Sequence, residues 1–191
     1  MSCVIEVPNL NRRVHRVTVG FYHQLTALGL VKKQTELIRG VIVNKMSKSP
    51  LHTSMSKRLS DLLRSLLPTS YSVRRDDPLT LVDSEPEPDV AVVVGTDDQF
   101  WNSHPKTAEL VIEVAVTSLA DDREMAPIYA EAAVKEYWIV VAEKRQVEVY
   151  RQPENGQYRE QRIYTEQDTL TCTSVPGVSF PLAGLFAAPA Q

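Results

Sequence analysis

Residues 109–142 read ELVIEVAVTSLADDREMAPIYAEAAVKEYWIVVA, and this stretch decides the fold class of the chain. Its two ends, 109–116 and 136–142, are nearly continuous apolar runs, which is typical of strands buried on both faces of a sheet. The segment 117–134 between them carries acids near its start, which favours a helix because negative charge stabilises a helix N-terminus. A strand, a helix and a strand in this order predict two strands of one sheet joined by a crossover.

Further strands are predicted on both sides of this unit. The apolar runs 89–94 and 146–151 should lie in the same sheet. An Asn-Gly pair after the second run predicts a tight hairpin turn into a strand over 158–163. Upstream, residues 71–81 read as a strand or a pair of strands.

The first third of the chain predicts a hairpin and two helices. Residues 35–43 read as two short strands joined near Gly40. The clearest helix is 50–67, which begins with a Pro that suits a first helical position. Its apolar stripe consists of Met55, Leu59, Leu62, Leu63, Leu66 and Leu67. A second helix is predicted within 17–30, with Phe21, Leu25 and Leu28 at helical spacing.

Together these elements predict an α/β fold, in which helices flank a mixed β-sheet that carries additional antiparallel strands. One domain is expected over 17–191, after an irregular lead-in over 1–16. No run of about 18 apolar residues indicates a membrane span. The polar N-terminal stretch and the presence of only two Cys residues favour a cytoplasmic protein.

Charge is distributed unevenly along the chain. Residues 1–75 hold 13 of the 21 Lys and Arg residues but only three of the 24 acids, although the whole chain has a net charge of -3. A basic half suits contacts with the phosphates of DNA. The alternative is that the basic and acidic halves pair with each other across the fold.

Two acids lie in the apolar runs, because Asp89 opens one run and Glu113 lies inside the next. A carboxylate in such a position is costly unless it is paired or bound to a cation. Two such acids on neighbouring strands indicate a divalent metal ion held by oxygen ligands. The alternative for each is a structural carboxylate at a strand edge, capped by backbone N–H groups.

The Pro-Asp pair that ends at Asp89 and the triplet Glu113-Val114-Ala115 resemble the motif of the PD-(D/E)XK nuclease superfamily. More closely, residues 18–186 resemble the Uma-type family of restriction-endonuclease-like proteins. The resemblance implies a restriction-endonuclease-like fold and hydrolysis of DNA with Mg²⁺ or Mn²⁺. It assigns the metal to Asp89, Glu113 and the carbonyl of Val114, a small oxygen set of the kind that Mg²⁺ accepts.

The same resemblance adds Glu36 and His52 as catalytic candidates. Glu36 opens a Glu-Leu-Ile-x-Gly pattern in the predicted hairpin, where an exposed acid without a function is an equal alternative. His52 lies at the start of the Leu-rich helix, on the same face as Met55. A histidine there is often a structural hydrogen-bonding group, so this alternative also stays open.

A lysine that the superfamily uses is missing. It normally follows the second acid by two residues, where this chain has Ala115. The Uma-type family instead presents a lysine from the following helix, four residues before a Tyr, and in this chain Met125 holds that position before Tyr129. Arg123 is the nearest cation, but two residues along a helix point to nearly opposite sides. Further cations, without a spacing argument, are Lys135, Lys144 and Arg145.

Three functions follow from these patterns. The first is a Mg²⁺-dependent endonuclease acting on DNA, favoured by Asp89, Glu113, Glu36 and His52. The second is a catalytically inactive relative that binds nucleic acid through the basic residues of 1–75, and the third is a protein that binds a protein partner on the same scaffold. Met125 favours the second and third. A symmetric homodimer would allow both DNA strands to be cut, and no membrane partner is expected.

Overall fold

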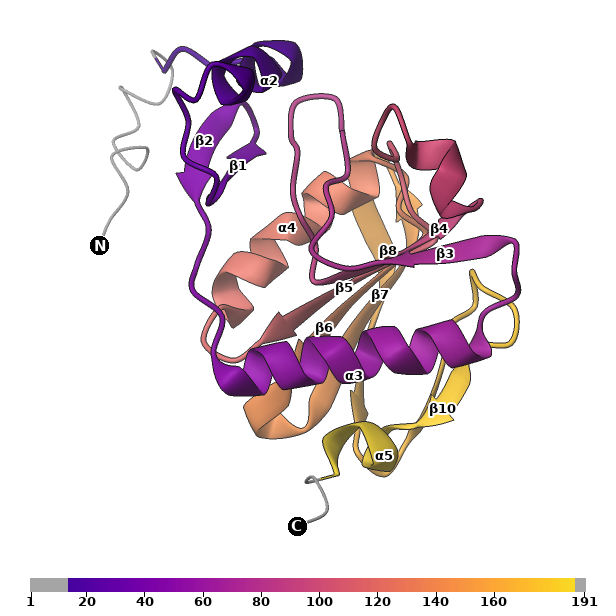
Figure 1. Cartoon of the computed structure of the whole chain (residues 1–191). Helices are drawn as coiled ribbons and strands as arrows, with labels where there is room; N and C mark the ends of the chain where they lie inside the picture. The colour runs from indigo at the N-terminus through magenta and orange to yellow at the C-terminus, as the bar shows by residue number, and fades with distance from the viewer. Residues whose placement is uncertain (1–13, 188–191) are drawn as a thin grey trace.

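The computed structural model describes residues 14–187 and centres on one six-stranded sheet (Figure 1). The strands are β3 (Tyr71–Arg74), β4 (Val90–Val94), β5 (Leu110–Ala115), β6 (Glu136–Val141), β7 (Gln146–Glu154) and β8 (Gln157–Thr165), in that spatial order. β5 and β6 run parallel, and the other neighbours in this sheet run antiparallel. Helix α4 (Leu119–Glu131) connects the parallel pair. The prediction of an α/β fold with a mixed sheet and one crossover is confirmed.

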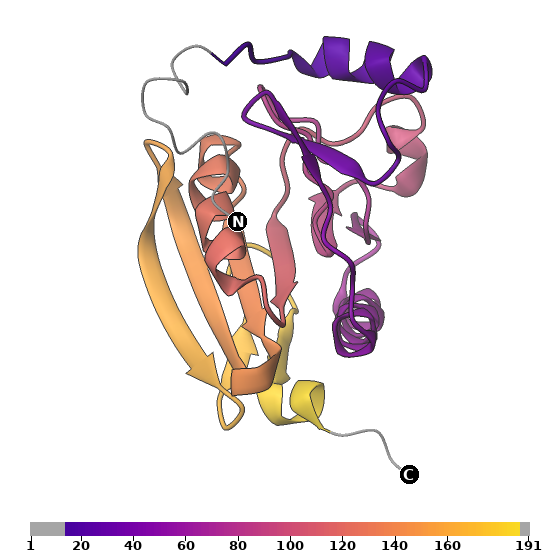
Figure 2. The ribbon, with the colours of Figure 1, turned by 90° about the vertical axis from the view of Figure 1, so that its left-hand side faces the viewer.

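Both faces of the sheet are covered, which explains the continuous apolar runs. In β5 and β6, the even-numbered apolar residues pack in a cluster with helix α3 (Pro50–Leu66), and the odd-numbered ones pack in a cluster with α4. Trp138 and Tyr137, neighbours in β6, are both fully buried on opposite faces. Figure 2 shows α3 end-on and α4 on opposite sides of β5. Because a strand in such a sheet is buried on both sides, its residues are apolar at nearly every position instead of at every second one.

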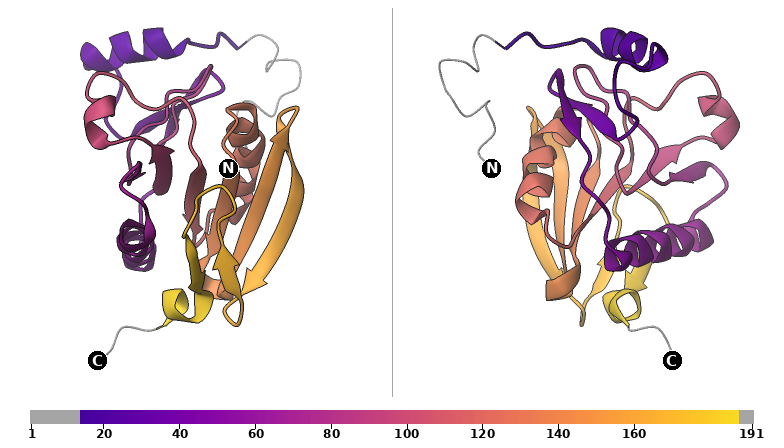
Figure 3. Two further views of the ribbon diagram at one scale, coloured as in Figure 1. Left: turned by 90° about the vertical axis from the view of Figure 1, so that its right-hand side faces the viewer. Right: turned by 60° about the vertical axis from the view of Figure 1, so that its left-hand side comes forward.

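Helix α3 follows the prediction for 50–67 closely. The Ser49 hydroxyl caps its N-terminus by accepting a hydrogen bond from the backbone N–H of His52 at 3.2 Å. Met55, Leu59 and Leu63 are buried against the sheet. The C-terminal elements β9 (Thr169–Thr171), β10 (Ser179–Pro181) and α5 (Leu182–Phe186) pack on the same face, below α3 (Figure 3).

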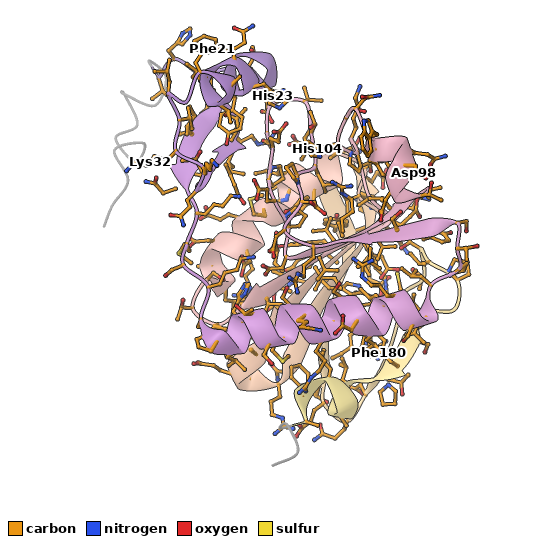
Figure 4. All side chains as sticks on the ribbon, viewed as in Figure 1. Phe21, His23, Lys32, Asp98, His104 and Phe180 are labelled. Atoms are coloured by element: carbon orange, nitrogen blue, oxygen red, sulfur yellow. The ribbon has the colours of Figure 1, made fainter. Side chains whose placement is uncertain are left out.

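The N-terminal helix α2 (Val19–Ala27) lies within the predicted range 17–30, but two of the apolar residues at helical spacing remain exposed. Phe21 and Leu28 are 46% and 72% exposed, and Phe21 points away from the sheet (Figure 4). The helix is held instead by Tyr22, whose hydroxyl donates to the carbonyl of Thr35 at 3.0 Å, and by His23, which contacts Glu85. The helix predicted within 17–30 is therefore present, and polar contacts rather than a buried apolar stripe attach it.

The hairpin of β1 (Thr35–Ile38) and β2 (Val41–Asn44) forms as predicted and stands apart from the main sheet. Its turn residues, Arg39 and Gly40, both have positive φ. Leu37 is fully buried, and an isolated bridge to Glu85 joins the hairpin to the loop before β4. The backbone N–H of Glu85 donates to the carbonyl of Leu37 at 2.6 Å, which fixes the first strand of the hairpin beside that loop.

Several predicted boundaries differ from the structure. The strand within 71–81 ends at Arg74, and a loop with positive φ at Asp76 and a Pro at position 78 replaces the rest, since Pro lacks the N–H that a strand ladder needs. Helix α4 is shorter than 117–134, and Ala133 has positive φ just after it. Two 3₁₀ helices, η2 (Asp97–Phe100) and η3 (Ala142–Lys144), lie in connections.

The expected lead-in over 1–16 lies mostly outside the described residues, because the structure describes the chain from residue 14. Between residues 14 and 187, no helix combines the length and the apolar character that crossing a membrane requires.

Candidate functional site

A cleft of about 760 Å³ opens between the β1–β2 hairpin and the start of α4. Its lining comes from six separate parts of the chain: the hairpin, the segment 45–49 after it, the start of α3, the loop before β4, the end of β5 and the segment 116–128, which contains most of α4. These parts meet on the left side of Figure 1. The four residues predicted as catalytic, Asp89, Glu113, Glu36 and His52, all line this cleft, together with Val114.

The strand register brings Asp89 and Glu113 together. β4 and β5 run antiparallel with Val90 opposite Ile112, so Asp89 and Glu113 lie one step beyond this pair. The backbone N–H of Asp89 donates to Oε2 of Glu113 at 3.1 Å, and the backbone N–H of Val114 donates to Oδ2 of Asp89 at 2.8 Å. Each acid therefore accepts a hydrogen bond from the strand that carries the other.

Asp89 is almost fully buried and is surrounded by donors. In addition to the Val114 N–H, its Oδ2 lies 2.9 Å from Nε2 of His52, and its Oδ1 accepts a hydrogen bond from Nζ of Lys48 at 2.8 Å. Burial alone would raise the pKa of Asp89, but the bond from His52 and the charge of Lys48 hold it below its ordinary value. These contacts therefore favour the ionised form of Asp89.

Glu113 has the opposite electrostatic character. Its Oε1 accepts a hydrogen bond from the hydroxyl of Tyr129 on α4 at 2.8 Å. Burial, followed by the negative charges of Asp89 and Asp122, raises the pKa of Glu113 well above its ordinary value. Two neighbouring acids whose pKa values are pushed apart in this way are typical of functional sites, and a bound cation would favour the ionised form of both.

Glu36 and His52 occupy the edges of the cleft. Oε1 of Glu36 accepts the backbone N–H of Glu87 at 3.2 Å, and burial raises the pKa of Glu36. His52 approaches Asp89 through Nε2, while its Nδ1 is buried and has no hydrogen-bond partner among the described residues. A neutral ring that donates through Nε2 carries its lone pair on Nδ1, so this geometry suits a group that orients Asp89.

Two cleft residues were not singled out as site residues from the sequence. Lys48 contacts both Asp89 and Asp76, and these carboxylates raise its pKa although burial alone would lower it. Asp122, in the first turn of α4, accepts a hydrogen bond from the Ser118 hydroxyl at 2.7 Å, and burial raises its pKa to about 6. No motif in the sequence points to Lys48, whereas Asp122 is one of the acids near the start of the predicted helix 117–134.

Met125, which occupies the position of the missing lysine, lies on the side of α4 that faces the cleft. The other cations considered from the sequence lie elsewhere. Arg123 donates to Glu148 at 3.0 Å, and Lys135 pairs with Glu109 at 2.8 Å. None of Arg123, Lys135, Lys144 and Arg145 lines the cleft in the part of the chain that the structure describes.

The cleft is acidic overall. Its lining contains eight carboxylates, Glu36, Asp76, Glu87, Asp89, Glu113, Asp121, Asp122 and Glu124, but only three Lys or Arg side chains. Those three, Arg39, Lys45 and Lys48, pair with acids of the acidic part of the chain, 76–191. This pairing matches the alternative in which the basic and acidic halves complement each other. An acidic cleft repels a phosphate unless a cation lies between them.

The donor set fits a hard divalent ion. Within residues 14–187, no group of three or more His, Cys, Asp and Glu side chains is arranged to hold a metal. Mg²⁺ usually retains several waters and is bound through one or two carboxylates, so Asp89 and Glu113 are a sufficient set of side chains. Both carboxylates face a cleft large enough for those waters.

Comparisons with known proteins agree with this architecture. A search of curated proteins finds no match. Among solved structures, one described as "a putative nuclease belonging to DUF820", from Anabaena variabilis ATCC 29413, superposes with a TM-score of 0.72 at 16% identity, over 84% of this chain and 94% of that chain. The likeness shows a nuclease-like fold. The model of the Uma2 family, described as "Putative restriction endonuclease", matches residues 21–183, and the chain therefore belongs to the Uma2 family.

Proposed function

We propose that this protein is an endonuclease that hydrolyses phosphodiester bonds of DNA with the help of Mg²⁺ or Mn²⁺ bound at Asp89 and Glu113. One observation carries the proposal. Each of these two acids accepts a hydrogen bond from the backbone of the segment that carries the other, and both line an open cleft. Restriction-endonuclease-like proteins usually use divalent metals, and the family assignment supports the same chemistry here.

Each residue has a role in this proposal. Asp89, Glu113 and the Val114 carbonyl would hold the ion, which when bound supplies positive charge to the phosphate and acidifies a water. His52 and the Val114 N–H hold Asp89 in one orientation. Tyr129 does the same for Glu113 from α4.

The reaction itself needs one base and one source of positive charge. A water oxygen forms a bond to phosphorus, one P–O ester bond breaks, and the departing alkoxide takes up a proton from solvent. The proton lost by the attacking water passes to a carboxylate of the cleft. We assign this role to Glu36, because it lines the cleft, is not one of the proposed metal ligands, and is made more basic than an ordinary carboxylate by the burial that raises its pKa.

DNA would reach this cleft from the side of the hairpin. The exposed Lys32 and Lys33 precede β1, and Lys32 points into solvent (Figure 4). We propose that such residues of the basic half contact phosphates, so that the logarithm of the affinity for duplex DNA falls linearly with the logarithm of salt concentration. A homodimer with two such clefts would cut both strands.

Calorimetric titration with Mn²⁺ and cleavage of plasmid DNA test the proposal together. The native protein should bind Mn²⁺ and cut the plasmid only when a divalent metal is present. Asp89→Ala and Glu113→Ala should each lose both properties, whereas Asp61→Ala, which removes an exposed acid of α3 outside the cleft, should keep both. Equal heats from the native protein and the Asp89→Ala, Glu113→Ala double variant would refute the metal site.

The alternative is a catalytically inactive nuclease fold that binds nucleic acid or a protein partner. Met125 favours it, since an apolar thioether on the cleft side of α4 cannot stabilise a phosphate anion. In that case the native protein would bind duplex DNA in fluorescence anisotropy, or bind no DNA at all, and would leave the plasmid intact with every metal tested.

A further inference from the structure

The cleft has one cation in contact with its candidate metal ligands, and it comes from an unexpected part of the chain. Nζ of Lys48 lies 2.8 Å from Oδ1 of Asp89 and also contacts Oδ1 of Asp76. Among residues 14–187, Lys48 is the sole Lys or Arg side chain within ion-pair distance of Asp89 or Glu113. It belongs to the segment 45–49, between the hairpin and α3, which has no regular secondary structure.

The opposite wall of the cleft lacks such a group. On α4, Tyr129 reaches Glu113 with its hydroxyl, and Met125, one turn earlier, lines the cleft on the same side of the helix. A cation at position 125 would therefore face the two acids, but the side chain there is uncharged. The positive charge that faces Asp89 enters instead from the hairpin side.

Two other cations of the cleft are engaged differently. Lys45 pairs with Glu87, and Arg39 makes a bidentate contact with Glu131, with one bond of 2.7 Å. Neither contacts Asp89 or Glu113 in the described residues. All three cations therefore line the cleft, but among them Lys48 is the one that contacts a candidate metal ligand.

The two oxygens of Asp89 also differ. Oδ2 accepts the buried Val114 N–H and lies against His52, whose side chain is only 14% exposed. Oδ1 has Lys48 as its hydrogen-bond partner, and the Lys48 side chain is 39% exposed. Because it is long and partly solvated, this side chain can turn outward at little cost, so Oδ1 is the oxygen that a metal ion can take over.

We propose that Lys48 supplies the ammonium group that position 125 lacks, an inference that rests on the proposed nuclease function. Without metal, the ammonium neutralises Asp89 through Oδ1. When a divalent ion binds Asp89, repulsion between the two cations displaces Nζ toward the open cleft, where it contacts a non-bridging oxygen of the scissile phosphate. Lys48 is thus both a competitor of the metal and a phosphate-binding group.

This double role predicts opposite effects of one substitution on two measurements. Lys48→Met keeps the length of the side chain and removes its charge. Mn²⁺ affinity, measured by calorimetry without DNA, should rise by about tenfold because the competing ammonium is gone. Plasmid cleavage at saturating Mn²⁺ should fall by about 10²–10³, the usual effect of removing one charge-stabilising donor.

The matched control is Lys135→Met. Lys135 also pairs with a carboxylate at 2.8 Å, that of Glu109, but it lies outside the cleft and outside the basic half, so both measurements should stay at native values. Lys45→Met tests whether the removal of any positive charge from the cleft raises Mn²⁺ affinity. Its effect should be clearly smaller than that of Lys48→Met. Urea unfolding of each variant shows that it is folded. Adding Met125→Lys to Lys48→Met should restore cleavage.

The outcomes separate this inference from the proposed function. If the native protein binds Mn²⁺ and cuts DNA but Lys48→Met cuts equally fast, the role of Lys48 is overturned and the nuclease stands. Equal gains in Mn²⁺ affinity for Lys48→Met and Lys45→Met would refute the proposal that Lys48 competes with the metal ion for Asp89. Absence of Mn²⁺ binding in both the native protein and Lys48→Met would refute the metal site itself, and with it the inference.

Discussion

Two buried acids at opposite ends of the main sheet have very different surroundings. Glu136 opens β6 and is 1% exposed, and Asp89 immediately precedes β4 and is 4% exposed. Glu136 accepts hydrogen bonds from Trp138 at 3.0 Å, from Arg151 at 3.1 Å, and from backbone and hydroxyl groups of the segment 173–174. All of these donors are fixed around Glu136, so we call this end of the sheet the closed end, although a cleft of about 440 Å³ lined by Arg151, Thr173 and Ser174 lies beside it, and we call the end at Asp89 the open end.

The pKa of Asp89 is also held below its ordinary value, by the hydrogen bond from His52 and the charge of Lys48, but this acid is not saturated by fixed donors. One of its oxygens is held by the Val114 N–H, while the other relies on the partly exposed Lys48. The comparison teaches that burial of an acid does not by itself indicate a site. In a structural acid, fixed donors satisfy both carboxylate oxygens. In a functional acid, one oxygen has a mobile partner that a ligand can replace.

The largest effect is expected at the closed end. Glu136→Ala should lower the free energy of unfolding by about 3–5 kcal/mol, because it leaves the guanidinium of Arg151 buried with its main partner removed. Urea denaturation at neutral pH measures the change. A loss below about 1 kcal/mol would mean that Glu136 is not the fixed structural acid described above.

A smaller effect on folding is expected at the open end. Asp89→Ala should cost only about 1–2 kcal/mol without metal, because water can solvate the released Lys48. The native protein should gain about 2.7 kcal/mol in Mn²⁺ at a hundred times its dissociation constant, and the variant should gain nothing. Thermal unfolding with and without Mn²⁺ checks both values. A Mn²⁺-induced gain that persists in the variant would place the ion elsewhere.

The local patterns of the sequence predict the frame of the molecule well. The segment 109–142 specifies the crossover, because two apolar runs of strand length flank a segment long enough for a helix. The hairpin of 35–43 follows from the turn residue Gly40. The grouping of Asp89 and Glu113 was also predictable, since acids in adjacent buried strands meet at the same sheet edge. The motif resemblance pointed to the same pair.

The remainder depends on contacts between distant segments. Lys48 reaches Asp89 only because the hairpin is attached through Leu37 to the loop before β4, and no periodicity encodes that attachment. The attachment of α2 has a similar origin, because hydrogen bonds of Tyr22 and His23 hold this helix. Polar long-range contacts of this kind leave no repeating pattern in the sequence.

The smallest expected effect concerns pH, and it has opposite signs at the two ends of the sheet. Hydrogen bonds from Thr173 and Trp138, although opposed by burial, hold the pKa of Glu136 below its ordinary value. Its stabilisation is therefore present above its unfolded pKa and is lost as the pH falls through the folded pKa. At the open end, burial raises the pKa of Asp122 to about 6, from an ordinary value of 3.8.

Asp122 therefore stabilises the fold fully below its ordinary pKa, and this contribution is lost as the pH rises through about 6. Asp122→Asn removes the loss, so its free energy of unfolding relative to the native protein should increase between pH 4 and pH 7.5, by about 1–2 kcal/mol given the partial exposure of this group. Urea unfolding across this range in the presence of a chelator measures it, with the exposed Asp98→Asn as control (Figure 4). Parallel profiles for both variants and the native protein would show that Asp122 is solvated like a surface acid, and the cleft would then be more open to water than its geometry indicates.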